Sequence, residues 1–86
     1  MYLILVYDVN VERVSKVNKY LKRFLVWIQN SVFEGEIRES TYETMVKGLL
    51  KIIKNGDKVI IYKLRTENYL ERIMFGNQNQ DIKTIL

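Results

Sequence analysis

The chain has 86 residues, a formal net charge of +4 at pH 7, and no histidine, cysteine or proline. A domain of this length has a small core, and without cysteine neither disulfides nor a thiolate metal site can supplement it, which favours oligomerisation. Because the commonest general base and transition-metal ligand is absent, any catalysis must use carboxylates, hydroxyls, lysines or a hard metal ion.

The first predicted element is a strand over residues 2–8, which are rich in leucine, β-branched and aromatic side chains. Both of its alternating faces are apolar, so both should be covered. Over residues 11–25 the apolar spacing becomes that of a helix, with basic side chains on the opposite face. These basic residues are Arg13, Lys16, Lys19, Lys22 and Arg23.

Residues 26–37 predict a second strand, in which Gly35 permits a bulge or a turn. A second helix follows an apparent capping box, because Ser40 and Glu43 have the required spacing and precede apolar residues at helical intervals. We therefore expect this helix to begin near Thr41.

The second helix is predicted to end at Asn55 and Gly56, which suit a left-handed cap. Residues 57–65 form the third predicted strand, again apolar on both faces, and residues 69–75 form the fourth. Beyond a polar run, residues 81–86 are a short β-prone tail.

The order of elements is thus strand, helix, strand, strand or turn, helix, strand, strand and tail. It indicates an α+β protein with a ferredoxin-like βαββαβ fold, in which two helices cover one face of a four-stranded antiparallel sheet. Residues 1–86 are thus expected to form a single domain. Two helices leave the other sheet face uncovered, although the first and third strands are apolar on both sides. We expect a second copy of the chain to cover that face in a two-fold homodimer.

The sequence shows no sign of membrane insertion or export. No apolar run approaches the roughly 18 residues of a membrane span, and no basic segment precedes a signal-peptide core. The absence of cysteine fits a reducing compartment. We therefore expect a soluble, cytoplasmic protein with no membrane partner.

Asp8 ends the first apolar strand and has two interpretations. It could begin the following loop and accept a hydrogen bond from the start of the first helix. Alternatively, the Asp8 side chains of two subunits could face each other near the two-fold axis and share a hard cation such as Mg²⁺. Such an ion could orient a water and stabilise charge on a phosphodiester without histidine.

Two stretches, "VYDVNVERVSKVNKYLK" and "IQNSVFEG", together resemble the CRISPR-associated endoribonuclease family, the small dimeric partner of the CRISPR integrase. In the first motif the matching residues are Asp8, Arg13, Lys16, Val17, Lys19 and Leu21, and in the second Gln29, Ser31, Val32, Phe33 and Glu34. The resemblance spans essentially the whole chain. One departure is Trp27, where many members carry an arginine; we expect this side chain to pack rather than to stack on a base.

The resemblance implies a ferredoxin-like homodimer with Mg²⁺ between the paired Asp8 side chains. It also implies that residues 77–86 are a linker and an extra C-terminal strand, which crosses to pair with the partner's sheet. Some members cleave RNA or DNA with a metal, and in others the protein is a non-catalytic bridge that holds spacer-precursor DNA for the integrase.

Three functional hypotheses follow for this chain. In the first, a protein of CRISPR adaptation (spacer acquisition) cleaves RNA or DNA, with Asp8 binding Mg²⁺ and Ser31 or Tyr7 orienting the phosphate. In the second, the basic face of the first helix clamps nucleic-acid phosphates without catalysis. The third is a ribonuclease toxin of a related ferredoxin-like family.

Overall fold

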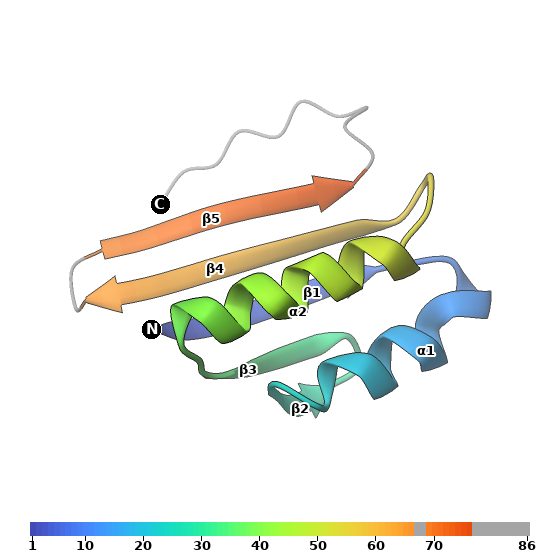
Figure 1. Ribbon diagram of the computed structural model, residues 1–86. Helices are drawn as coiled ribbons and strands as arrows, with labels where there is room; N and C mark the ends of the chain where they lie inside the picture. Colours follow the sequence, from blue (N-terminus) through green and yellow to red (C-terminus); the bar gives the residue numbers. More distant parts are fainter. Residues whose placement is uncertain (67–68, 77–86) are drawn as a thin grey trace.

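The computed structural model describes residues 1–66 and 69–76 (Figure 1). Its strands and helices, in chain order, are β1 (Tyr2–Asp8), α1 (Val11–Leu21), β2 (Val26–Gln29), β3 (Val32–Glu36), α2 (Glu39–Ile52), β4 (Lys58–Thr66) and β5 (Tyr69–Gly76). The strands form one antiparallel sheet in the order β2-β3-β1-β4-β5, and both helices lie against one face of it (Figure 1). This confirms the predicted α+β class and agrees with the ferredoxin-like arrangement.

The prediction of one continuous strand over residues 26–37 is wrong, because this segment forms the β2–β3 hairpin. Asn30, at the turn, has a φ of 43°, a left-handed conformation that asparagine tolerates better than most residues. Gly35 lies inside β3 and is not the turn. The fifth strand of the sheet therefore comes from this hairpin, and the predicted C-terminal strand in residues 77–86 lies outside the described residues.

The second helix begins at Glu39, earlier than the capping box predicted. Its N-cap is Arg38, which makes no side-chain capping bond, and Ser40 lies inside the first turn. There the Ser40 carbonyl accepts a hydrogen bond from Thr44 Oγ1 at 3.2 Å. The predicted capping box is therefore not formed, because the helix has already started before Ser40.

Both helices end before the predicted positions. The first helix stops at Leu21, and the chain turns before β2. The second helix stops at Ile52, and its C-cap, Ile53, is already extended. Gly56 does adopt a left-handed φ of 93°, but in the turn that leads into β4 and not as the helix cap.

The core lies between the helices and one face of the sheet. From β1 it receives Leu3, Leu5 and Tyr7, which are buried, whereas Ile4 on the opposite face is 37% exposed. We call this opposite surface the open face. It carries Tyr2, Ile4, Val6 and Asp8 of β1, opposite Leu64, Tyr62, Ile60 and Lys58 of β4. The described part of the chain leaves this largely apolar surface uncovered.

Candidate active site at the end of strand β1

Asp8 is the last residue of β1, and its side chain is exposed on the open face. In the antiparallel register it lies opposite Lys58, the first residue of β4. Its carboxylate makes no hydrogen bond or ion pair with the residues that the structure describes. The helix-capping interpretation of Asp8 is wrong, because the Asn10 side chain accepts the bond from the Glu12 N–H at 3.0 Å.

Ser31 is brought beside the end of β1 by the β2–β3 turn. Its carbonyl accepts a hydrogen bond from the Tyr7 N–H at 3.1 Å. The Tyr7 ring, in contrast, is 4% exposed and stacks on Phe33 in the core, with 6.2 Å between ring centroids. Of the two residues predicted to assist Asp8, Ser31 therefore has a partly exposed side chain near it, whereas the Tyr7 ring packs in the core.

An open pocket of about 300 Å³ adjoins Asp8, and we call it the Asp8 pocket. It is lined by Tyr7, Asp8, Val9, Val14, Asn30 and Ser31. Its lining thus comes from the end of β1, the first turns of α1 and the β2–β3 turn. Asn30 is not among the predicted site residues. The sequence does contain a signal for it, because asparagine is common in turns and this one directly precedes Ser31.

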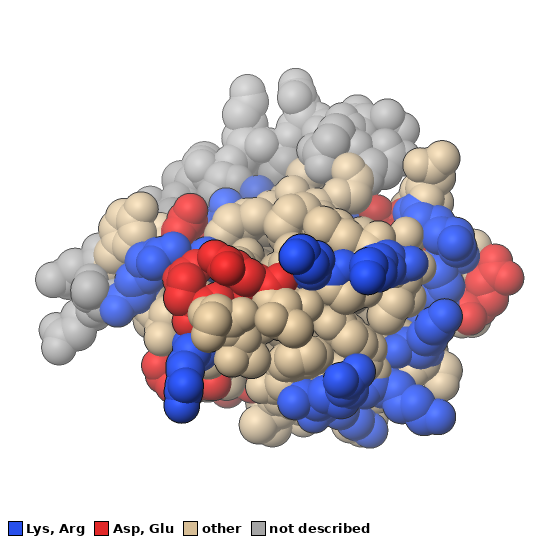
Figure 2. All heavy atoms as spheres, in the orientation of Figure 1, with Lys and Arg blue, Asp and Glu red and all other residues tan. Residues whose placement is uncertain are grey.

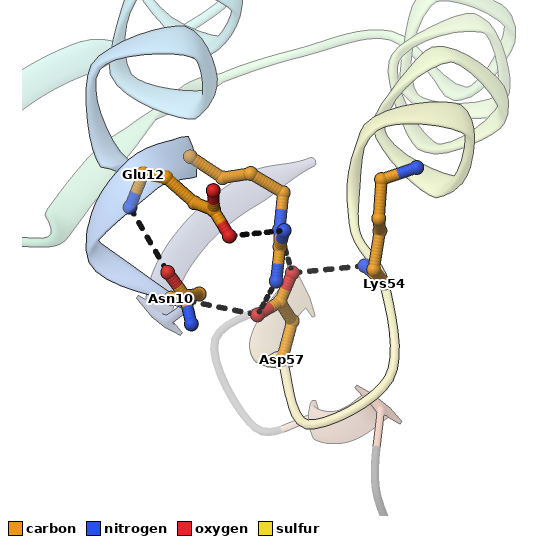
Figure 3. A network of polar contacts seen from close by, with 5 residues as sticks. Asn10, Glu12, Lys54 and Asp57 are labelled. Atoms are coloured by element: carbon orange, nitrogen blue, oxygen red, sulfur yellow. Dashed lines mark hydrogen bonds and ion pairs between the residues drawn. The ribbon is translucent and has the colours of Figure 1, made fainter.

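Behind this site, a buried carboxylate fixes the loop that follows Asp8. Asp57 is 1% exposed and accepts two hydrogen bonds from Arg13, from Nε at 2.6 Å and from Nη2 at 3.0 Å (Figure 3). It also accepts hydrogen bonds from the backbone N–H groups of Asn10, at 2.9 Å, and Lys54, at 2.8 Å. One side chain thereby joins the start of α1 to the segment between α2 and β4.

The charge state of Asp57 follows from these contacts. The hydrogen bonds from Arg13, with smaller contributions from the Lys54 and Asn10 N–H groups, lower the pKa of Asp57 from 3.8 to about 2, against the opposing effect of burial. Arg13, predicted to bind nucleic acid, has its guanidinium engaged by this carboxylate. Sequence reasoning missed Asp57 because an aspartate at the start of a predicted strand carries no local sign of its partners.

The other four predicted basic residues are exposed. Three of them line an open groove of about 460 Å³ between the helices, which we call the basic groove; its residues are Lys16, Lys19, Tyr20, Arg23 and Ile52. Figure 2 shows Lys and Arg side chains gathered over α1 and the adjoining part of α2.

The fourth exposed basic residue, Lys22, lies outside the basic groove. Its Nζ is 4.9 Å from the centroid of the Trp27 ring. Trp27 is 48% exposed, so its ring is only half-buried and lies against the Lys22 side chain. Its Nε1 donates to the Asn30 carbonyl at 2.8 Å and so braces the turn beside the Asp8 pocket.

One chain alone supplies a poor site for a hard cation. Among residues 1–66 and 69–76, no three acidic side chains lie together in a way that could hold a metal ion. Mg²⁺ requires about six oxygen ligands but is often held by one or two carboxylates together with waters and substrate phosphates. An exposed, unpaired Asp8 on an uncovered face fits such a site if a second carboxylate approaches it.

None of the helices in the described ranges is both long enough and apolar enough to cross a membrane.

Residues 1–72 match the family described as CRISPR associated protein Cas2. A Pyrococcus furiosus protein named CRISPR-associated endoribonuclease Cas2 is 58% identical over 67 residues, which are 77% of this chain and 79% of that protein. A protein of the same name from Methanothermobacter thermautotrophicus is 45% identical over an alignment of 87 residues, which covers 100% of this chain and 96% of that protein.

Solved structures agree with this assignment. One described as the crystal structure of cas2 has a TM-score of 0.75 at 42% identity, covering 100% of this chain and 98% of that one. Streptococcus pyogenes Cas2 has a TM-score of 0.69 at 29% identity, covering 79% of this chain and 89% of that one. The family match, the relatives and the shared fold agree, and the chain belongs to the CRISPR-associated Cas2 family.

Proposed function

We propose that the protein is a homodimeric endoribonuclease in which the Asp8 side chains of two subunits share one divalent cation. The observation that carries this proposal is the state of Asp8, which is exposed, unpaired among the described residues and located on an uncovered apolar face. The name endoribonuclease, which the relatives carry, supports RNA as the substrate.

The homodimer is supported by the apolar character of the open face. Ile4, Leu64 and Leu70 are 37%, 41% and 39% exposed there, and Leu64 lies opposite Leu70 in the sheet. Exposed apolar side chains grouped on a sheet face are characteristic of an interface rather than of solvated surface. A two-fold axis close to the end of β1 would bring the two Asp8 carboxylates together.

The bound cation would supply a polarised phosphate and an activated water. The protein's own residues would have simpler roles. Asp8 would hold the cation and fix its position, and the Ser31 hydroxyl would donate a hydrogen bond to a phosphate oxygen. Lys16, Lys19 and Arg23, on the helix side of the sheet, would attract RNA to the protein through their charge.

The test is cleavage of a labelled single-stranded RNA by wild-type protein and by Asp8→Asn, over a range of Mg²⁺ concentrations and with a chelator. We expect wild-type cleavage only with the divalent ion, and a rate reduced by about two orders of magnitude or more in Asp8→Asn. Glu43→Gln, which removes an exposed carboxylate on α2, should cleave like the wild type.

Equal cleavage by Asp8→Asn and wild type, purified in parallel, would refute the proposal and indicate a contaminating nuclease. Cleavage that persists without a divalent ion would contradict the metal-dependent chemistry.

A second function, a non-catalytic bridge that holds DNA for the CRISPR integrase, is favoured by the basic groove. Its three cationic side chains line the groove beside the helices, and the helices cover the sheet face opposite to the open face, which carries Asp8. A DNA duplex held there would not need Asp8. Asp8→Asn that still binds DNA and still supports spacer acquisition would favour this function, and loss of both would argue against it.

A further inference from the structure

The Asp8 pocket has the size and mixed lining of a site for one small group. Its volume of about 300 Å³ is at the lower end of the range for ligand pockets. Val9 and Val14 supply apolar surface, and Asn30 and Ser31 supply polar groups. Apolar walls with a few polar groups are typical of a site that holds a ligand in one orientation.

Hydrogen bonds to the backbone fix both sides of this pocket. On one side, Trp27 Nε1 donates to the Asn30 carbonyl at 2.8 Å. On the other, the N–H of Asn10, next to Val9, donates to Asp57 at 2.9 Å. The walls are therefore positioned by contacts that do not use the Asn30 or Ser31 side chains.

The Asn30 side chain is left available for a ligand. It is exposed, and its carboxamide makes no hydrogen bond with a residue of the described ranges. A carboxamide offers a donor and an acceptor side by side, and this pair matches the N6 and N7 edge of adenine. Single-stranded RNA exposes such base edges to proteins.

We infer that the Asp8 pocket is a subsite for the base of the nucleotide next to the phosphate at Asp8, and that Asn30 selects adenine there. This inference rests on the proposed endoribonuclease function, and adds a specificity-determining residue to it. Val14 belongs to α1 and Asn30 to the β2–β3 turn, so the pocket includes groups from outside the open face.

The variant Asn30→Gly isolates the carboxamide. Glycine adopts the φ of 43° without a steric cost, and the bond from Trp27 is retained because it goes to the backbone carbonyl. Asn55→Gly, which removes an exposed carboxamide from the turn before β4, is the matched control.

The first experiment is cleavage of an RNA with randomised nucleotides, followed by sequencing of the product ends. We expect wild type and Asn55→Gly to enrich adenine on one side of the cut by about ten-fold, and Asn30→Gly to cleave without this enrichment. Cleavage by wild type with no preference at either neighbouring nucleotide, or an adenine preference that survives in Asn30→Gly, would overturn the inference.

The second experiment separates this inference from the nuclease activity. Backbone amide shifts of Val9, Val14, Asn30 and Ser31 are followed by NMR while adenosine 5′-monophosphate or uridine 5′-monophosphate is added without a divalent ion. Larger shifts with the adenosine nucleotide, absent in Asn30→Gly, would support the subsite even in a protein that cleaves nothing. Equal responses to both nucleotides, or shifts confined to other residues, would refute it.

Discussion

Replacing Asp57 by asparagine should destabilise the protein more than any other change of a single carboxylate in the described chain. Asp57 is buried and accepts four hydrogen bonds, two of them from Arg13, whose side chain is only 15% exposed. The substitution keeps the size of the side chain but removes its charge. Arg13, a poorly solvated cation, then loses its buried partner and keeps the exposed Glu12 carboxylate, 3.7 Å from its Nη1.

Two arguments set the size of the effect at pH 7. A pKa lowered from 3.8 to about 2 corresponds, at about 1.4 kcal/mol per pKa unit, to about 2.5 kcal/mol of unfolding free energy from the ionised carboxylate. Removing one partner of a buried ion pair costs about 3 to 5 kcal/mol. We therefore expect Asp57→Asn to lower the unfolding free energy by about 3 kcal/mol.

The same pair makes this loss depend on pH. Because the pKa of Asp57 is lower in the folded state, its contribution is complete above the unfolded value of 3.8 and disappears as pH falls through about 2. Between about pH 5 and pH 2, wild type should thus lose about 2 kcal/mol more stability than Asp57→Asn.

The assay is urea unfolding at a fixed protein concentration with a chelator present, since dimer formation and metal binding would both alter the apparent stability. Asp8→Asn is the control, because this exposed carboxylate has no partner among the described residues and its loss should change stability by less than about 0.5 kcal/mol. A loss below about 1 kcal/mol for Asp57→Asn, or a loss independent of pH, would refute the reasoning.

Three further changes test the packing, the open face and the basic groove. Gly48→Ala should destabilise the protein by about 1 to 3 kcal/mol in thermal unfolding, although alanine is the better helix former, because its Cβ would clash with Tyr20 Oη. Unchanged or increased stability would show that Tyr20 moves freely. Ile4→Asp places a charge in the centre of the open face, so sedimentation should show a monomer, whereas an unchanged dimer would place the interface elsewhere. The double variant Lys16→Gln, Lys19→Gln should reduce the salt dependence of RNA binding. The slope of the logarithm of the binding constant against the logarithm of the salt concentration should become shallower by about 0.7 for each phosphate that is no longer neutralised. An unchanged slope would exclude the basic groove as the RNA-binding surface.

The parts of the fold that the sequence could predict are those where one periodicity dominates. The prediction of the first strand, Tyr2–Asp8, is correct because apolar residues fill both of its faces. The β2–β3 hairpin is not predicted because the two strands are short and only the polar residues Asn30 and Ser31 separate them, without a glycine or proline at the turn. Asparagine in a left-handed turn is a weaker sequence signal than glycine, so the turn at Asn30 is not predicted from the sequence.

The candidate site was predictable only in part, because charge in a sequence does not reveal its partners. Arg13 and Lys16 look alike as members of one basic helix face, yet the first is bound to a buried carboxylate and the second is exposed. Asp57 becomes buried only because the turn before β4 and the start of α1 meet in space. Such long-range pairs are fixed by the topology of the chain and not by local pattern.

The central claim, that two Asp8 side chains share one cation for RNA cleavage, is tested most directly by mixing subunits. Wild-type and Asp8→Asn chains are unfolded together in known proportions, refolded, and assayed for Mg²⁺-dependent cleavage at a constant total concentration. If both carboxylates are required, activity falls with the square of the wild-type fraction, so an equal mixture retains about a quarter of the wild-type rate. A linear decline, with about half of the rate retained in the equal mixture, would show that each Asp8 acts alone and would contradict the shared site.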